Sequence, residues 1–334
     1  MSLSHTLQLH IEQLREIRSI LKAMKNLAFM ELHKLKGGTD RQSEVVAHLE
    51  QVALDFLYYY PLPVEEGVTF LSIGVLLGAE RGFCGDFNES LLKSIVNQDF
   101  KQVITIGNRL CNQLDEATLE SDIQLAGANV IEEVPGVIQH LVEVIQSLLE
   151  SQHARQGLLK LKLTLVYHDN ATHQIEQHQL LPAFSRRLAV EVISDDNISE
   201  RSDAFNIGQA DDSTRFDPSV IRRGRTIRQG ETSSRSNPVT LNENRLIPLG
   251  GEPLLNVAPN EFYTDLLEHY LISALHEIFY SSLAAENQSR LQHLEAALKY
   301  MDDETDKLQR KSQSYRQEEI TEEIEVILLN SAVE

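Results

Sequence analysis

Residues 260–334 read NEFYTDLLEHYLISALHEIFYSSLAAENQSRLQHLEAALKYMDDETDKLQRKSQSYRQEEITEEIEVILLNSAVE and contain neither Gly nor Pro. The composition of the whole chain, 16 Gly and 9 Pro in 334 residues, predicts about five or six of them in such a stretch. Because nothing here breaks a helix, we expect one helix of about 100 Å, at about 1.5 Å per residue. A helix of that length exceeds the diameter of a domain this size. Its apolar residues therefore need a partner helix or a sleeve of other subunits.

The first 36 residues supply a candidate partner helix, because they also contain no Gly or Pro. Their apolar residues recur in steps of three and four, which predicts one helical face. The residues of this face are Leu7, Ile11, Leu14, Ile17, Leu21, Met24 and Ala28. The matching C-terminal face consists of Leu291, Leu294, Leu298, Met301, Thr305, Leu308, Ser312 and Tyr315. Its two hydroxyl residues predict a loose seam, since a tight coiled coil would have leucines there.

The charges of the terminal segments agree with this pairing. Residues 1–40 carry six Lys and Arg against four Asp and Glu, a sum of +2, and residues 301–334 carry four against ten, a sum of −6. Exposed ion pairs each add only about 0.2–1 kcal/mol. We therefore expect burial of the apolar faces, at roughly 25 cal/mol per Å², to supply most of the stability.

The overall charge limits the kind of partner. A net charge of −20 and a pI of about 5.0 argue against binding of nucleic acid or an anionic membrane, since both need local excesses of Lys and Arg. Partners with basic surfaces fit better. No apolar run approaches the roughly 18 residues that span a bilayer, and the N-terminus lacks the apolar core of a signal peptide. These features predict a soluble, cytoplasmic protein.

Between the terminal helices, strand-like and helix-like segments alternate, which is typical of an α/β unit. We expect one sheet of about four or five strands. The expected strands lie at 68–77, 102–106, 160–167 and 174–181, and the expected helices at about 86–97 and 135–153. The predicted domains are an N-terminal helix region at 1–60, an α/β domain at 61–198, a loop-rich insertion at 199–258 and a C-terminal helix at 259–334.

One Gly-rich loop invites a catalytic interpretation, Gly78-Ala79-Glu80-Arg81-Gly82-Phe83-Cys84-Gly85, because it follows a strand and precedes a helix. A phosphate loop of the Walker type needs Lys and Ser or Thr after its last Gly. Here Asp86 follows instead and is expected to put a carboxylate where phosphate would sit. The spacing of a Rossmann dinucleotide loop is absent too. The loop therefore predicts no nucleotide or other cofactor site.

The cysteines and histidines indicate no enzyme or metal site. Cys84 has no His close in sequence, so a structural thiol in a turn is favoured over a nucleophile. Cys84 and Cys111 also lack metal-ligand spacing. His173 and His178 flank a strand-like segment, and we expect both to be solvated surface residues.

Residues 199–251 differ in texture from the rest of the chain. They are rich in Ser, Asn, Asp, Arg and Gly, contain few aromatic residues and show no periodicity. This composition predicts a long loop or a disordered insertion. The Arg-rich stretch at 222–228 has two interpretations, a site for phosphate or an acidic surface and a solvated loop, and the solvated loop is favoured.

Three short motifs stand at both ends and in the middle of the chain: KAMKNLA at residues 22–28, ERGFCGDFN at 80–88 and RQEEITEEI at 316–324. They resemble, in the same order, the motifs Lys-Ala-Met-Lys-Met-Val-Ala, Ser-Asp-Arg-Gly-Leu-Cys-Gly-Gly-Phe-Asn and Arg-Gln-Ala-x-Ile-Thr-x-Glu-Leu of the γ subunit of F-type ATP synthases. Residues 286–294 are also similar to that family's Ser-Glu-x-x-Ala-Arg-Met stretch, with Arg290 and Leu291 in register.

The resemblance implies an antiparallel coiled coil of the terminal helices and an α/β foot that binds no nucleotide. It implies a non-catalytic rotor subunit, turning inside a hexamer of α and β subunits and coupling ion flow to ATP synthesis or hydrolysis. Its other partners would be the ε subunit and the ring of c subunits, at the cytoplasmic face of the bacterial inner membrane. The residues that match the family's subunit contacts are Lys22, Met24, Glu80, Arg81, Gly82, Cys84, Gly85, Asp86, Arg316, Gln317, Ile320 and Thr321.

Some positions depart from the family pattern. The N-terminal helix is shorter before its motif, Gly37-Gly38 is expected to interrupt it, Asp86 replaces a Gly, and Glu318-Glu319 makes the last helix more acidic. These departures resemble the sequences of a divergent branch of bacterial rotary ATPases, the alternate or N-type enzymes. They do not decide whether the coupling ion is H+ or Na+. The insertion lies where chloroplast and cyanobacterial γ subunits carry one, but it has no Cys for a disulfide switch. Our hypothesis is that it modulates ATP hydrolysis.

Two other classes of protein stay open at this point. A coiled-coil scaffold outside an ATPase predicts a stable self-associated species. A small α/β nucleotide-binding enzyme with helical arms predicts saturable binding of ATP or a dinucleotide. The rotor predicts neither, because its isolated chain would expose apolar residues that await the hexamer and would aggregate.

Overall fold

The computed structural model describes residues 3–61, 70–95, 98, 100–116, 122–156, 160–184 and 254–331. The chain divides into two compact units, one of Met1–Ala183 with Glu252–Glu334 and one of Phe184–Gly251. The predicted insertion at 199–251, with its Arg-rich stretch, lies outside the described residues. The helices and strands of the described residues belong to the first unit.

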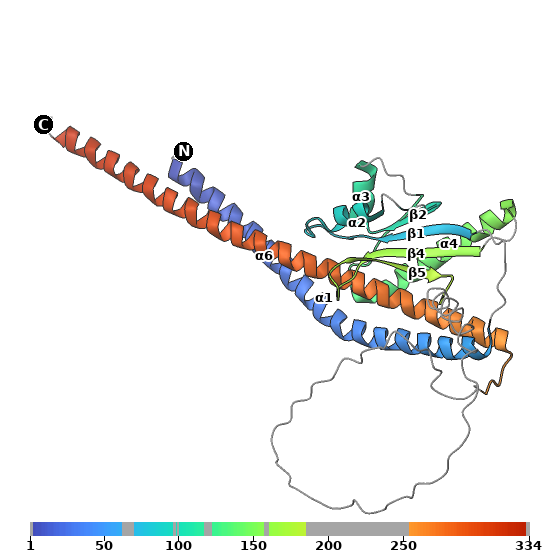
Figure 1. Cartoon of the computed structure of the whole chain (residues 1–334). Coiled ribbons are helices and arrows are strands. Elements are labelled where there is room, and N and C mark those ends of the chain that lie inside the picture. Colours follow the sequence, from blue (N-terminus) through green and yellow to red (C-terminus); the bar gives the residue numbers. More distant parts are fainter. Residues whose placement is uncertain are drawn as a thin grey trace, which may run out of the picture. The chain divides into compact units, whose positions relative to one another are not determined.

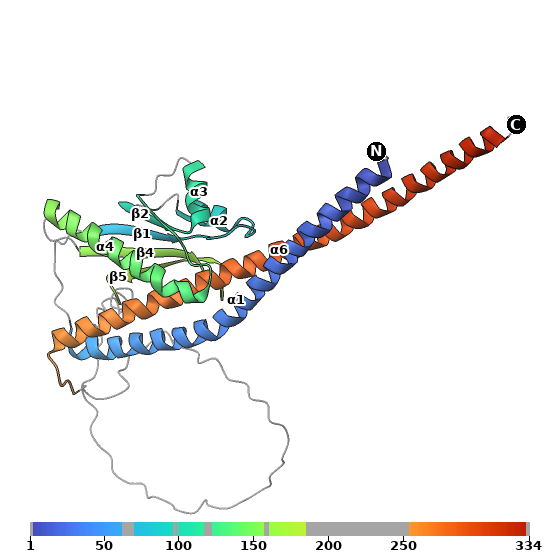
Figure 2. The same ribbon diagram turned by 180° about the vertical axis from the view of Figure 1, so that it is seen from behind.

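Two long helices from the two ends of the chain pack side by side (Figures 1 and 2). Helix α1 spans Leu3–Tyr59 and helix α6 spans Pro259–Ser331. Ser4 near the start of α1 donates a hydrogen bond from its hydroxyl to Glu319 Oε2 at 2.7 Å, whereas Phe56 near its end packs against Phe262, with 5.0 Å between the ring centroids. The pair is therefore antiparallel, as expected.

The seam between α1 and α6 is apolar with polar interruptions. All eight residues of the expected C-terminal face are buried or partly buried, including the hydroxyl-bearing Thr305 and Ser312. A buried cluster of Leu21, Leu294 and Met301 joins the two helices. The prediction of a seam with hydroxyls in its middle is thus confirmed.

One residue of the expected N-terminal face is wrong. Ile17 is 47% exposed, and Arg18 occupies the seam position instead, where it pairs with Asp302. The expected face takes two three-residue steps in a row, from Ile11 to Leu14 and from Leu14 to Ile17. Because an α-helix has 3.6 residues per turn, two such steps move the side chain off the contact face. A four-residue step from Leu14 leads to Arg18, which lies on that face.

The expected interruption at Gly37-Gly38 is also wrong, since α1 continues through both residues. Gly38 is where the short helix η1 (Ile131–Glu133) comes close to α1. A Cβ atom at Gly38 would lie only 3.3 Å from Ile131 Cδ1. The glycine therefore permits a close approach between elements, and tertiary packing of α1 outweighs its low helix propensity.

The α/β part contains a five-stranded sheet in the order β3-β2-β1-β4-β5. Its strands are β1 (Phe70–Leu77), β2 (Gln102–Ile106), β3 (Ile123–Leu125), β4 (Lys160–His168) and β5 (Ile175–Leu181). Strand pairing is parallel except between β4 and β5. The four predicted strands are confirmed, whereas β3 was not predicted, because three residues are too few to show a period.

The helices of this part are α2 (Phe87–Ile95), α3 (Asn108–Glu116) and α4 (Val134–Gln156). Helix α4 lies behind the sheet in Figure 1 and in front of it in Figure 2. Leu91 of α2 and Leu110 of α3 are fully buried in a core with Leu76 of β1 and Val166 of β4. Helix α3 was also not predicted, since only Leu110, Cys111 and Leu114 of its nine residues are apolar. The core places the carboxyl ends of β1 and β2 beside each other, which sets the position of the loop that follows β1.

Candidate functional site: the loop between β1 and α2

The Gly-rich loop follows the carboxyl end of β1 and lies against α6. Two of its residues have positive φ, Phe83 at 65° and Gly85 at 61°. Its start is held by the buried side chain of Asn88, whose Oδ1 accepts a hydrogen bond from Ala79 N at 2.8 Å. Its end is held by Ser289 of α6, which donates from its hydroxyl to the carbonyl of Cys84 at 2.8 Å. The loop is therefore attached to both the α/β part and the long helix.

Glu286 and Arg290 of α6 form a buried ion pair beneath the loop. The Glu286 carboxylate also accepts the backbone N–H groups of Glu80 and Arg81, both at 3.3 Å. Arg290 Nε donates to the Gly82 carbonyl at 3.3 Å. Burial raises the pKa of Glu286, and Arg290 and the two N–H groups oppose that effect. Buried charges persist when they are paired and hydrogen-bonded, and here the loop backbone supplies those bonds.

The sequence alone assigned Glu286 and Arg290 no role, although both lie in the resembling stretch 286–294. The available signal was the i,i+4 spacing of Glu and Arg, which places both side chains on one side of a helix. That spacing is common on solvated helix faces. Only the position of the loop shows that this pair is buried.

Cys84 is a structural thiol, as expected. Its sulfur lies 3.5 Å from the carbonyl oxygens of Arg81 and Gly82 and 4.0 Å from Glu286 Oε1. Burial, reinforced by the charge of Glu286, raises the pKa of Cys84 to about 12. Because the thiolate is the nucleophile, a thiol with so high a pKa is inert at neutral pH.

Glu80 places its carboxylate at the start of α3. The Glu80 Oε2 atom accepts hydrogen bonds from Asn108 N at 2.8 Å and Gly127 N at 2.7 Å, and Oε1 accepts one from the Asn108 side chain. The N-terminus of a helix after a parallel strand is where many α/β folds bind phosphate. We expected Asp86 to put a carboxylate there, which is wrong: Asp86 is exposed at the other end of the loop, and Glu80 does so.

The residues that the family resemblance predicts as subunit contacts fall into two groups along α6. The first group contains the Lys22 motif and the loop after β1. Lys22 is exposed on α1, and Met24 packs on the cluster of Leu21, Leu294 and Met301. In the loop, Arg81, Gly85 and Asp86 are exposed, Glu80 and Gly82 are partly buried and Cys84 is buried. Both sets lie beside the middle of α6, because Lys25 pairs with Glu295 at 2.7 Å and a Cβ at Gly85 would lie 3.8 Å from His293 Nδ1.

The second group lies further along α6. Arg316, Gln317, Ile320 and Thr321 are all exposed, opposite the first turn of α1. From Met301 to Arg316 the helix rises by roughly 20 Å, at about 1.5 Å per residue. The loop and the Lys22 motif therefore lie beside the same part of α6, and the C-terminal motif lies further along the axis of that helix.

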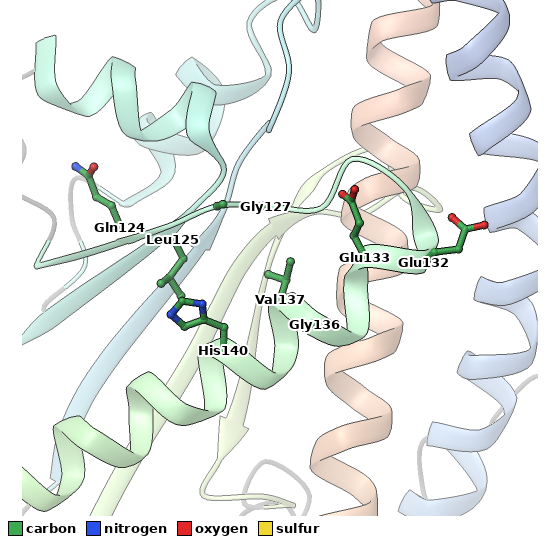
Figure 3. A pocket seen from close by; sticks show the side chains of 9 residues that line it. Gln124, Leu125, Gly127, Glu132, Glu133, Gly136, Val137 and His140 are labelled. Atoms are coloured by element: carbon green, nitrogen blue, oxygen red, sulfur yellow. The ribbon is translucent and has the colours of Figure 1, made fainter.

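An open pocket of about 490 Å³ lies between β3 and the start of α4 (Figure 3). Its charged lining is engaged within the chain: Glu132 pairs with Lys34 of α1 at 3.3 Å, and Glu133 Oε2 accepts a hydrogen bond from Asn129 N at 2.7 Å. Figure 3 shows Glu132 and Glu133 turned away from His140. The pocket thus offers no convergent set of charged groups for a small ligand.

The described residues also give no metal or membrane-spanning element. No group of three His, Cys, Asp or Glu side chains among them is placed to hold a metal ion. Within the same residues, no helix combines the length and the apolar character needed to cross a bilayer. His173 is exposed as expected, whereas His178 is partly buried, with its Nε2 3.5 Å from Tyr270 Oη.

Comparison with known proteins adds a family and a fold. The profile of a family described as ATP synthase matches residues 4–330. A chain of the Euglena gracilis mitochondrial ATP synthase rotor, in rotational state 1, is 13% identical over 95% of this chain and 98% of that chain, with a TM-score of 0.52. A chain of the OSCP/F1/c-ring assembly of that enzyme, in rotational state 3, is 13% identical over 99% and 94%, with a TM-score of 0.54. Among curated proteins, no significant match is found. At this identity, the solved structures establish a shared fold.

Proposed function

The chain belongs to the γ-subunit family of ATP synthases, and from this premise we propose that it couples ion flow to ATP chemistry through two exposed surfaces, the loop after β1 and the end of α6. Members of this family form the non-catalytic central stalk, and catalysis lies in the β subunits. The chain is accordingly a rotor subunit.

One observation supports the proposal most strongly: α6 extends beyond α1 and exposes apolar side chains there. Helix α1 begins beside Glu319, whereas α6 continues to Ser331. Five large apolar residues of this extension are between 49% and 66% exposed: Ile320, Ile324, Val326, Ile327 and Leu328. Such a stretch marks an interaction site, because an isolated soluble helix does not keep so many apolar side chains in water.

The partners in this proposal are the α and β subunits around the helix pair and the ε subunit and c-subunit ring at the α/β part. The comparison chains come from assemblies whose descriptions include a rotor, F1 and a c-ring. Met24, Arg81 and Arg316 belong to the set that would contact the hexamer as the chain turns. The hydroxyls Thr305 and Ser312 suit a rotor, because a loosely packed shaft presents no single deep lock at one angle.

We place the complex at the cytoplasmic face of a bacterial inner membrane, with this chain attached through the other subunits. Attachment through the other subunits is supported by the absence of a membrane-spanning helix among the described residues and by the net charge of −20, which an anionic membrane repels. The similarity to the N-type branch and the modulating role of residues 199–251 stay predictions. Deletion of 199–251 tests the second: unchanged hydrolysis and coupling would contradict it.

Affinity purification of the tagged chain from its own cells tests the proposal directly. We expect three α and three β subunits per copy, together with ε and c subunits, by mass spectrometry of the intact assembly. Recovery of the chain alone, or as a self-associated species, would overturn the rotor proposal and favour the scaffold alternative.

A cross-link tests rotation within that assembly. An Ile324→Cys variant, joined to the surrounding hexamer by a photoreactive maleimide, is expected to lose most ATP hydrolysis. A matched Lys93→Cys variant, at an exposed position of α2, carries the same reagent and is expected to keep hydrolysis. Equal hydrolysis in a fully cross-linked Ile324→Cys complex would contradict rotation of α6 inside the hexamer.

A further inference from the structure

Glu80 joins three segments of the α/β part through one carboxylate. The side chain leaves the loop after β1 and accepts hydrogen bonds from Asn108 at the start of α3 and from Gly127 after β3. A Cβ atom at residue 127 would lie 3.0 Å from Glu80 Oε2, so Gly127 leaves the space that the carboxylate uses. The bonds are charge-assisted, and the partial positive charge at the helix N-terminus strengthens them. The carboxylate thus acts as an anion built into the fold.

The same loop is held from the opposite side by α6. Glu286 accepts the backbone N–H groups of Glu80 and Arg81, and Arg290 donates to Gly82. Residue 80 therefore has its backbone bound to the long helix and its side chain bound to α3 and the end of β3. A rotation of the Glu80 side chain would break the bonds that join the loop to α3 and to the segment after β3.

What the junction leaves in solvent is the middle and end of the loop. Arg81, Asp86 and Phe83 are exposed, and the Phe83 side chain is 46% exposed despite its size. Phe83 also has a φ of 65°, a left-handed conformation that a bulky residue adopts only where the surrounding structure enforces it. Aromatic and Arg side chains are the residues that most often dominate protein interfaces.

We propose that Glu80 is a positioning residue of the rotor: its carboxylate sets the conformation in which Arg81, Phe83 and Asp86 meet the surrounding subunits, without touching those subunits itself. This inference rests on the proposed function. Within the motif, Arg81, Phe83 and Asp86 make the contacts, and Glu80 holds them in position. Coupling between rotation and ATP hydrolysis then depends on a carboxylate turned into the α/β part.

The test compares Glu80→Gln with wild type in the assembled complex. Glutamine keeps the shape but carries no negative charge, so the charge-assisted bonds from Asn108 and Gly127 are replaced by weaker neutral ones. Ion pumping per ATP hydrolysed is expected to fall at least about threefold, with the subunit composition unchanged, because loss of the charge-assisted bonds of Glu80 loosens the loop. Glu80→Asp, which keeps the charge, is expected to restore most of the coupling.

Amide hydrogen exchange on the full chain supplies a second readout. Backbone amides of residues 80–85 are expected to exchange about tenfold faster in Glu80→Gln than in wild type, since local opening governs exchange. The matched control is Glu89→Gln, an exposed carboxylate on α2 that pairs with Lys93 at 3.0 Å. This control is expected to leave both coupling and exchange unchanged.

The outcomes separate this inference from the proposed function. Wild-type coupling and wild-type exchange in Glu80→Gln would overturn the positioning role even in a complex that rotates. A chain that enters no ATPase complex would overturn the proposed function and the coupling role together, whereas faster exchange in Glu80→Gln would still establish the local junction. Where Glu80→Ala is used, 100 mM acetate is expected to slow the exchange again by occupying the vacated position, and no slowing would count against the anion role.

Discussion

Glu286 and Arg290 lie one turn apart on α6 and form a buried ion pair that also bonds to the backbone of the loop after β1, while Arg290 Nη1 donates to Asn287 Oδ1 at 2.9 Å. The pair therefore fastens the α/β part to the long helix. Its charges are separated from water by the loop that they hold.

Loss of one partner of this pair is expected to be costly. Arg290→Met leaves Glu286 buried without its cation, and removal of one partner of a buried pair costs about 3–5 kcal/mol. The free energy of unfolding in urea measures the effect. The control is Lys307→Met, which removes an exposed pairing with Glu304 and is expected to change stability by no more than about 0.5 kcal/mol. Equal effects of the two substitutions would contradict the buried junction.

Cys84 is expected to resist alkylation while the loop is docked. Because its pKa is raised to about 12, little thiolate exists at pH 8, and the buried sulfur is also inaccessible. Iodoacetamide at pH 8 should leave Cys84 unmodified in the native chain and modify it in urea, as peptide mass spectrometry measures. In Arg290→Met, the same assay should show faster modification. Rapid native labelling of wild type would show that the loop does not stay docked.

The glycine pair in α1 gives a matched comparison of helix propensity with packing. Gly37→Ala meets only the end of the flexible Arg41 side chain, 3.9 Å away, and is expected to stabilise by about 1 kcal/mol. Gly38→Ala has the same gain in propensity, but its Cβ would lie 3.3 Å from Ile131 Cδ1. We therefore expect Gly38→Ala to be less stable than Gly37→Ala in thermal unfolding. Identical stabilities would show that η1 does not press on α1.

Glu277 of α6 is expected to make stability depend on pH. Burial raises its pKa, and the nearby carboxylates Glu50 and Asp169 raise it further, against a hydrogen bond with Ser43. The folded state then binds this proton more tightly than the unfolded state. Its charge consequently costs stability as pH rises from the ordinary Glu pKa to the raised value, and the cost is complete above that value.

Glu277→Gln removes this titration. It is expected to raise the free energy of unfolding at pH 7 and to change it much less at pH 4, where wild-type Glu277 is largely protonated in both states. Chemical unfolding at the two pH values provides the measurement, and Glu318→Gln, an exposed carboxylate of the same helix, is the control. A pH-independent difference between variant and wild type would contradict the assignment.

Several local features followed from the residues alone. The absence of breakers in 260–334 predicted α6, and the run Gln102–Ile106 predicted β2 with its observed bounds. The C-terminal face with Thr305 and Ser312 was predicted correctly because helical spacing alone defines it. Where spacing was ambiguous, as between Ile17 and Arg18, the partner helix decided which side chain is covered.

In the candidate site, too, some features could be predicted from local sequence and others could not. The loop itself, its motif and the structural role of Cys84 could be predicted from local sequence. That Glu80 occupies the anion position could not, because Asn108 begins α3 and Gly127 follows β3, and these segments meet only at the carboxyl edge of the sheet.

By itself, the sequence determined the long helices, the alternating α/β segments and the family motifs, since all of these depend on residues that are close together in the chain. Only the tertiary structure decided that α1 runs through Gly37-Gly38, that Glu286 and Arg290 are buried, and that Glu80 faces inward. The physical reason is that burial and hydrogen-bond partners are set by segments distant in sequence, such as Glu80 and Glu286, which are 206 residues apart.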